Sequence, residues 1–573
     1  MRFSSLGTNR RRFKRRTIKS SLFCFFFASR TRRFYLCRFD VFYLPAKREN
    51  GFRKAFLFFT IMKKITAVLI FLIFYAPFSF AEISVTAYGA AEIVSGSCFL
   101  VETQEESFLV DCGLFIGEDN EIYSNSELPG ELVKAKALVL THAHLDHSGR
   151  IPLLVSKGFR GKIYSTPATK ELALSLFRNR NGFDIIKRKW FWSKLQKEKA
   201  ERKKVPVIAH WNEECGENIK EAGYCAVPAD LETLEKETGV QFLACKNCCA
   251  RDSDEIEKLF ETSEYGELKK ISRNVKFKLS DAGHIPGSAC IVFFIDGKKI
   301  LFSGDIGSGH SRLNDIFSIP EKADMIFMEA TYAGSRRDRG MRGYDIFRND
   351  LIKALGEGKI VWIPALAFNR TQKILFELNL MQKEGLLPDS VAVYSVSPGA
   401  NNITGIYQKE LKNKTGGWFS RKAYEEGSIV PAGLKQSKNI KFASPLVIIS
   451  SSGDMDKGMS SRLAQILLPR KDVSVMIVNY VGPKSAAGLL LSEKKKIRGI
   501  KNNASAKRYD VFSDHADFEA AEKWLSGQDK KTPVYLIHSQ KENAGKMGSL
   551  LMGQGWKNVS NALFKRKAVL EEK

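Results

Sequence analysis

Histidine is scarce in this chain of 573 residues: eight are present, and six of them gather in four short motifs. No segment recurs with a period of roughly 20 to 50 residues, which excludes a solenoid. Hydrophobic residues make up 44% of the chain, which excludes a largely disordered protein. The length predicts roughly two to four domains at ~150 residues each, so we expect a compact multi-domain protein.

Acidic residues are nearly absent from residues 1–61, which hold 16 Lys and Arg against 2 acids and show no helical or strand periodicity. We interpret them as an upstream extension that is not a domain. Met62-Lys63-Lys64 then opens an apolar run that closes on Ser79-Phe80-Ala81, the pattern of a signal peptide over residues 62–81. If Met62 is the true start, we expect export to the periplasm or medium, a mature chain from about Glu82, and no stable membrane insertion. Otherwise we expect a cytoplasmic protein, and a transit peptide or a retained anchor are the alternatives.

The net charge of +27 belongs largely to the front of the chain, since the part from Glu82 onward carries only +11. That mild excess suits a protein that contacts phosphates, and a surface with surplus lysine would look the same.

Eight of the ten cysteines follow Ala81, and five of these form one cluster: Cys215, Cys225, Cys245, Cys248 and Cys249. In an exported protein disulfides are expected, which is the reading we favour. In a cytosolic one, Cys245 and Cys248 with Cys215 or Cys225 could form a structural zinc site. Inert thiols are the third alternative.

A strand-like run, Ala135 to Leu140, leads into Thr141-His142-Ala143-His144-Leu145-Asp146-His147. Four metal-capable side chains therefore stand within six positions. Zinc binds neutral His nitrogen and carboxylate oxygen, and packing such donors together without a metal is unfavourable. The spacing predicts a metal site at the end of this strand.

This run resembles the HxHxDH signature of the metallo-β-lactamase superfamily. Three other stretches resemble that family's remaining motifs: Phe108-Leu109-Val110-Asp111, Asp281-Ala282-Gly283-His284 and Phe302-Ser303-Gly304-Asp305. Cys290 to Ile295 and Lys299 to Phe302 predict a hairpin that turns at Asp296-Gly297 and brings Asp305 beside His284.

Later stretches resemble motifs A, B and C of the β-CASP group in that superfamily: Ile326-Phe327-Met328-Glu329, Phe512-Ser513-Asp514-His515 and Val534-Tyr535-Leu536-Ile537-His538. His at the last position is the pattern of members that act on RNA, where the DNA-acting branch has Val. The resemblance therefore implies an RNA-processing nuclease, similar to the cleavage and polyadenylation endonuclease and related bacterial and archaeal RNases, with single-stranded RNA as its partner.

The resemblance also implies residue roles, with two Zn²⁺ ions per chain. The metal ligands would be His142, His144, Asp146, His147, His284, Asp305 and His538, of which Asp305 bridges the two ions. Asp111 would orient ligands by hydrogen bonds without binding metal. The catalytic residues would be Asp146, Glu329 and His515, with His515 protonating the leaving ribose oxygen after attack by hydroxide held between the metals.

Between motifs A and B, Lys359 to Pro364, Val391 to Val396 and Leu446 to Ser450 read as strands, and about Arg370 to Met381 as a helix. Arg370 and the Ser451-Ser452-Gly453 turn could contact a phosphate through the guanidinium and backbone N–H groups, with ordinary turn chemistry as the equal alternative.

The expected fold is α/β: an αββα metallo-β-lactamase sandwich with an inserted α/β β-CASP cap. We expect the sandwich domain over residues 82–335, with a Cys-containing insertion at about 187–264, the cap over 336–505 and a return segment over 506–573. A homodimer is one expected assembly. Two rival functions stay open: an exported metallo-hydrolase for another ester or amide, and an RNA-binding scaffold with a degenerate site.

Overall fold

The structure, a computed structural model, describes residues 19–28, 33–42, 83–116, 119–125, 127–178, 248–314, 317–332, 341–413, 418–437 and 439–570. The chain splits into two compact units, Met1–Phe80 and Ala81–Lys573. In the first unit, β1 (Lys19–Ala28) pairs antiparallel with β2 (Arg33–Phe42), in a segment whose sequence shows no strand periodicity. The predicted signal peptide, and Cys215, Cys225 and Cys245 of the cysteine cluster, lie outside the described residues.

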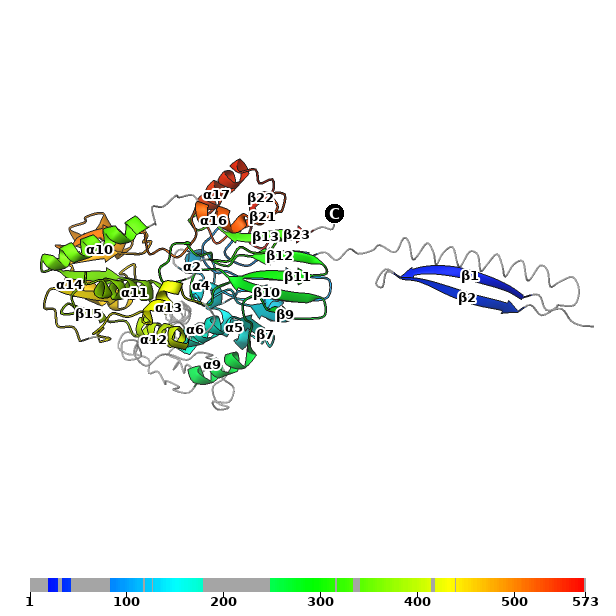
Figure 1. The fold of residues 1–573 in the computed structure, drawn as a ribbon, viewed down its shortest axis with the longest axis horizontal. Helices are drawn as coiled ribbons and strands as arrows, with labels where there is room; N and C mark the ends of the chain where they lie inside the picture. The colour runs from blue at the N-terminus through cyan, green and yellow to red at the C-terminus, as the bar shows by residue number, and fades with distance from the viewer. Residues whose placement is uncertain are drawn as a thin grey trace, which may run out of the picture. The chain divides into compact units, whose positions relative to one another are not determined.

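Two seven-stranded sheets form one part of the second unit, and the cap lies beside them (Figure 1). The first has the order β23-β3-β4-β5-β6-β7-β8, with bounds Lys567–Leu570, Ile83–Ala87, Phe99–Glu102, Ser107–Val110, Ala137–Val139, Lys162–Ser165 and Phe260–Thr262. The second has the order β22-β21-β13-β12-β11-β10-β9, with bounds Val559–Asn561, Val534–Ile537, Met325–Glu329, Lys298–Phe302, Ala289–Ile295, Val275–Asp281 and Leu268–Lys270.

The inner faces of the two sheets pack on each other through aromatic side chains. The Phe99 ring lies 5.6 Å from that of Phe302, and the Phe108 ring lies 4.9 Å from that of Phe293. Alternate residues along these strands face opposite ways, so each sheet also buries an outer face under helices. The helices α5 (Ile151–Ser156), α6 (Pro167–Arg178) and α9 (Cys248–Leu259) cover the first sheet, and α16 (Phe518–Leu525) and α17 (Lys541–Gly553) cover the second. The expected αββα sandwich is confirmed.

A five-stranded parallel sheet forms the cap, in the order β15-β16-β14-β17-β20. Its strands are Ala392–Ser395, Leu446–Ser450, Ile360–Pro364, Val473–Ile477 and Ser505–Arg508. The cap helices are α10 (Met341–Gly356), α11 (Arg370–Lys383), α12 (Pro398–Asn413), α13 (Arg421–Glu426), α14 (Gly458–Leu467) and α15 (Ala486–Leu491), and β18 (Lys496–Ile497) pairs with β19 (Ile500–Lys501). The chain leaves the sandwich after β13 and returns to it at α16 and β21, so the cap is an insertion.

The short-range sequence predictions are confirmed where the structure describes them. The hairpin closes with Ile295 opposite Lys298, around Asp296 and Gly297, whose φ angles are 48° and 85°. Strands β14, β15 and β16 and helix α11 fall in the expected segments. Among the described residues, no helix is both long and apolar enough to cross a bilayer.

Candidate metal centre

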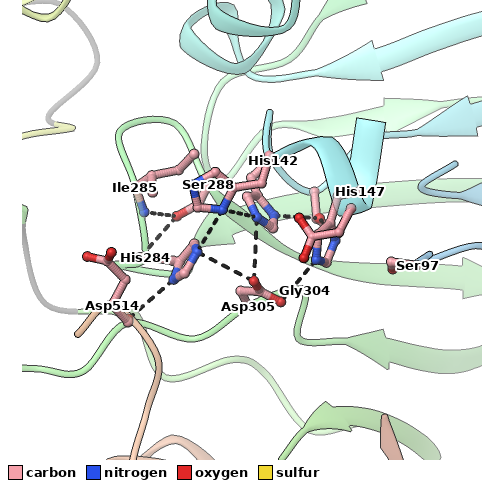
Figure 2. Close-up of polar contacts among 12 residues, drawn as sticks. Ser97, His142, His147, His284, Ile285, Ser288, Gly304, Asp305 and Asp514 are labelled. Carbon is pink, nitrogen blue, oxygen red and sulfur yellow. Dashed lines mark hydrogen bonds and ion pairs between the residues drawn. The ribbon is translucent and has the colours of Figure 1, made fainter. Parts of the chain in front are cut away.

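The metal-capable side chains lie on loops that follow strands of both sheets. His142 and His144 follow β6, and Asp146 and His147 belong to the next short helix, α4 (Leu145–Ser148). The second sheet supplies the rest: His284 after β10, Asp305 after β12 and His538 after β21. Figure 2 shows His142, His147, His284 and Asp305 pointing toward one another from these loops.

One group of donor atoms surrounds the Oδ2 oxygen of Asp305. His142 Nε2 lies 3.5 Å and His284 Nε2 lies 3.4 Å from that oxygen. His144 Nδ1 completes the group, 3.1 Å from His142 Nε2 and 3.2 Å from His284 Nε2. Three imidazoles and a carboxylate oxygen at such separations match the donor set of a tetrahedral zinc site.

A second group surrounds the other oxygen of the same carboxylate. Asp305 Oδ1 lies 3.2 Å from His147 Nε2 and 3.6 Å from His538 Nε2. His538 Nε2 is also 3.4 Å from Asp146 Oδ2. Asp305 thus presents one oxygen to each group, which is the arrangement of a carboxylate that bridges two metal ions.

Three buried atoms of this centre show that its donors fit a metal. His147 Nε2, His538 Nε2 and Asp305 Oδ1 are buried and have no hydrogen-bond partner. Buried polar atoms are rarely left without a partner, because desolvating them without compensation costs free energy. Since all three atoms belong to the second group, a cation between them would satisfy them together.

Neighbouring residues fix the ring nitrogens that face away from the donor groups. Asp111 lies 2.7 Å from His147 Nδ1 and accepts hydrogen bonds from Ser97 Oγ and from Thr141 N and Oγ1. Thr331 Oγ1 lies 2.9 Å from His538 Nδ1 and donates to the carbonyl of His538. Such partners orient each ring with Nε2 toward the donor groups. Burial lowers the pKa of His147, but Asp305 and Asp111 outweigh it and raise that pKa well above its ordinary value, so a cation bound at Nε2 would displace a proton.

Burial and charge set the protonation of the cluster. Burial is the largest influence on His142, His144 and His284 and lowers the pKa of each below its ordinary value, so these rings are neutral donors. Burial opposes ionisation of Asp305, but the surrounding histidines outweigh it and hold the pKa of this carboxyl well below its usual range.

His515 stands beside the two groups as a separate titrating residue. Its Nδ1 lies 3.1 Å from Glu329 Oε2, and its side chain is 18% exposed. Burial lowers the pKa of His515, but the carboxylates of Glu329 and Asp305 raise it more strongly, to about 9. Glu329 also accepts a hydrogen bond from the backbone N–H of Ile306, which fixes its position.

The proposed substrate-binding residues have internal contacts. Arg370 is buried, and its guanidinium donates to the carbonyl of Val478 and to Asp514. Ser451 N donates to Ser397 Oγ, and Gly453 lies close to Asn479. These contacts show no phosphate site, and the substrate-binding role of the four residues stays a prediction.

The structure adds residues to which the sequence assigned no role. Phe368 packs edge-on to His144 at 5.0 Å, and Asn369 donates to the carbonyl of His284. Asp514, part of motif B, pairs with Lys373. No sequence signal links these positions, because the partners lie between 85 residues apart, for Asn369 and His284, and 224 residues apart, for Phe368 and His144.

Comparison with known proteins matches two parts of this architecture. The model of the metallo-β-lactamase superfamily matches residues 92–218, and the model of the β-CASP domain matches residues 371–490. A ribonuclease of Thermus thermophilus is 26% identical over 497 residues, which are 84% of this chain and 98% of that protein. An RNase J-like protein of Methanocaldococcus jannaschii is 27% identical, over 79% of this chain and 92% of its own length. The Drosophila melanogaster cleavage and polyadenylation specificity factor 73 is 24% identical, over 80% of this chain and 60% of its own length.

The sandwich, its His and Asp clusters and these matches define a metal-dependent hydrolase that contains a metallo-β-lactamase domain, with divalent metal as its cofactor. The inserted cap is the part of the chain that matches the β-CASP domain.

Proposed function

We propose that this protein is a zinc-dependent ribonuclease that hydrolyses phosphodiester bonds of single-stranded RNA. Two zinc ions per chain would be held by the seven donors described above, with Asp305 between them. The observation that carries the proposal is the pairing of His515 with Glu329. His515 Nδ1 lies 3.7 Å from Asp305 Oδ2, so this pair sets a cationic acid at the edge of the metal centre.

Hydrolysis of a phosphodiester needs an attacking oxygen, neutralisation of growing negative charge, and a proton for the leaving oxygen. Bound zinc would supply a nucleophile at neutral pH and would neutralise charge on the phosphoryl oxygens. His515 would protonate the leaving ribose oxygen, and its raised pKa keeps the ring protonated at neutral pH. Glu329 orients His515 and stabilises its charged form.

RNA is supported as the substrate by two lines. His538 occupies the position of motif C that is His in the members acting on RNA and Val in the DNA-acting branch. Its Nε2 faces Asp146 and Asp305, as a metal ligand would. Relatives that span most of this chain carry the names of a ribonuclease and an RNase J-like protein.

The test is to count zinc in the purified protein and to incubate it and its His515→Ala variant with end-labelled single-stranded RNA. We expect about two zinc ions per chain in both proteins, and cleavage by the variant that is slower by a factor of ~10² to 10⁴, the usual contribution of a general acid. Two zinc ions with no RNA cleavage by the parent would exclude the ribonuclease and favour another ester or amide as substrate.

A further inference from the structure

A buried cluster of charged and amide side chains connects the cap to the metal centre. Asp514 lies in the loop before α16, and Asn369, Arg370 and Lys373 lie at the start of α11 in the cap. We call these four residues the cap cluster. Asn369 Nδ2 donates to Asp514 Oδ1 at 2.8 Å, Arg370 Nη2 donates to Asp514 Oδ2 at 3.2 Å, and the ammonium of Lys373 pairs with Oδ1.

All four side chains of the cap cluster are buried, with relative exposures of 0 to 6%. Burial raises the pKa of Asp514, but Lys373 and Arg370 outweigh it and hold that pKa well below its usual range. The carboxylate is therefore ionised between two cations, away from solvent. A buried ion cluster is costly to assemble and weak evidence of stability, so a role in holding one geometry is the better explanation.

The cap cluster holds a metal-ligand residue at both its ring and its backbone. The carbonyl oxygen of Asp514 lies 3.2 Å from His284 Nδ1, a contact drawn as a dashed line in Figure 2. Because a carbonyl oxygen can only accept, His284 Nδ1 must donate to it. Asn369 Nδ2 donates to the carbonyl of His284, also at 3.2 Å. With Nδ1 protonated, His284 Nε2 keeps a free electron pair toward His144 and Asp305.

Asn369 has a backbone shaped for this contact. Its φ of 57° lies in the left-handed region, which asparagine tolerates better than most residues. It precedes the first turn of α11, where a side chain usually caps the helix, yet its side chain makes no capping hydrogen bond. Tyr407 Oη instead donates to Asn369 Oδ1, which turns the amide nitrogen toward Asp514 and His284.

We propose that the cap cluster is a positioning device, through which the cap fixes the ring and loop of His284. It thereby sets the metal affinity of the donor group formed by His142, His144, His284 and Asp305 Oδ2. In the sandwich alone, the outer nitrogen of His284 would still find Asp514, but nothing from the cap would hold that loop. The inference rests on the proposed metal-binding role of His284 and does not depend on RNA as the substrate.

The test uses Asn369→Gly and Lys373→Met in the full chain. Glycine accepts the left-handed backbone, so Asn369→Gly removes the hydrogen bonds to Asp514 and His284, and that from Tyr407, without added backbone strain. Lys373→Met leaves Arg370 and Asp514 as a balanced pair. Zn²⁺ affinity is measured by competition with a chromophoric chelator, the visible spectrum of the Co²⁺-loaded protein is recorded, and thermal unfolding is followed without metal.

We expect both variants to bind the first equivalent of Zn²⁺ about 10- to 100-fold more weakly, which is the usual effect of losing a partner that orients a ligand, and to change the Co²⁺ spectrum. Lys373→Arg keeps the charge and should restore much of the affinity. Matched controls on the same helix are Asn379→Ala and Lys383→Met. In the parent, the amide of Asn379 donates to the carbonyl of Ser428, and the ammonium of Lys383 pairs with Glu426. These controls should lower thermal stability at most and leave Zn²⁺ affinity unchanged.

Unchanged Zn²⁺ affinity and Co²⁺ spectrum in folded Asn369→Gly and Lys373→Met would overturn the positioning role, even if both proteins were less stable. If Asn369→Gly does not fold, the comparison of Lys373→Met with Lys373→Arg decides alone. Weakened Zn²⁺ binding in a protein that cleaves no RNA would support the cap cluster and reject the ribonuclease. Intact Zn²⁺ binding in the variants of a protein that cleaves RNA normally would reject the cap cluster and support the ribonuclease.

Discussion

His515 is subject to two opposing influences, burial and the negative charge of its neighbours. Burial removes hydration from the charged ring, while Glu329 and Asp305 stabilise it, and the carboxylates prevail, since the pKa is raised to about 9. A general acid works in its protonated form, so its contribution is present below that pKa and is lost as the pH rises through it. If His515 is the general acid, as proposed, the rate of RNA cleavage should decline on the alkaline side of neutrality.

Glu329→Gln should move that alkaline decline to lower pH, because the amide keeps the hydrogen-bonding shape but removes the charge that favours the protonated ring. The measurement is kcat/KM for a short RNA across the pH range in parent and variant. We also expect a lower maximal rate, since the ring loses its fixed partner.

Glu321→Gln is the matched control, because this carboxylate pairs with Lys278 and Lys299 at the surface. Its pH profile should coincide with that of the parent. An alkaline limb that Glu329→Gln leaves in place would show that another group titrates there.

At the residue scale, the sequence predicted what local spacing can encode. His142, His144 and His147 come from one short run, so their proximity needs no knowledge of the fold. Asn369 and Asp514 meet across 145 residues, and only the packing of the cap on the sandwich brings them together. The contacts of Arg370 could not be predicted for the same reason. An arginine in this sequence context suggests binding to a phosphate, whereas in the fold its guanidinium binds Asp514.

At the scale of elements, the loop after β5 packs tightly against α4, the helix that carries two of the proposed metal ligands. A Cβ atom on Gly113 would lie 1.6 Å from the carbonyl oxygen of Asp146 and 2.6 Å from His147 N. Both neighbours are backbone atoms of α4, which cannot move without shifting the ligands. Glycine at this position lets the loop that carries Asp111 approach the metal centre.

Gly113→Ala should therefore lower the free energy of unfolding by about 3 kcal/mol and reduce Zn²⁺ affinity in the protein that still folds. Chemical denaturation and chelator competition measure the two effects. Gly130→Ala in α3 (Gly130–Val133) is the control, because a Cβ there meets nothing within 4 Å. Equal stability of the two variants would contradict the close approach.

Element positions were predictable where a pattern is local, as in the hairpin at Asp296-Gly297 and the strand β14. The order of strands in the sheets was not, because β13 lies between β12 and β21, and β21 is about 200 residues further along the chain. That neighbour relation depends on the return of the chain after the cap.

At the scale of the whole molecule, the donors join the two halves of the sandwich. His142, His144, Asp146 and His147 belong to the first sheet, and His284, Asp305 and His538 to the second. Metal bound among them would tie the sheets together at one edge. Removing it would leave buried, unsatisfied nitrogens and a carboxylate at that edge.

Chelation should therefore lower the thermal unfolding temperature, and added Zn²⁺ should restore it. Metal present at about 1,000 times its dissociation constant stabilises the folded state by about 4 kcal/mol. Hydrogen exchange should rise on chelation at residues 141–148, 282–288 and 304–307, while the cap strand β14 stays protected. Loss of protection spread evenly over both domains would argue against a metal that ties only this edge.

The front of the chain allows a separate prediction from its sequence. If Met62 is the start and residues 62–81 are a signal peptide, protein isolated from its native source should begin near Glu82. N-terminal sequencing measures this directly, and a mature chain that retains residues before Met62 would exclude export by this route.

The parallel pairing of β13 with β21, with Glu329 opposite Ile537, has an evolutionary consequence. The two ends of the inserted cap leave and re-enter the sandwich on adjacent strands, so the length of the inserted chain puts no tension on the sheet. Caps of other sizes could be exchanged at this junction while Glu329 and His538 kept their spacing. A transplanted cap would, however, have to bring its own cations for Asp514, and this requirement would limit which caps and sandwiches are compatible.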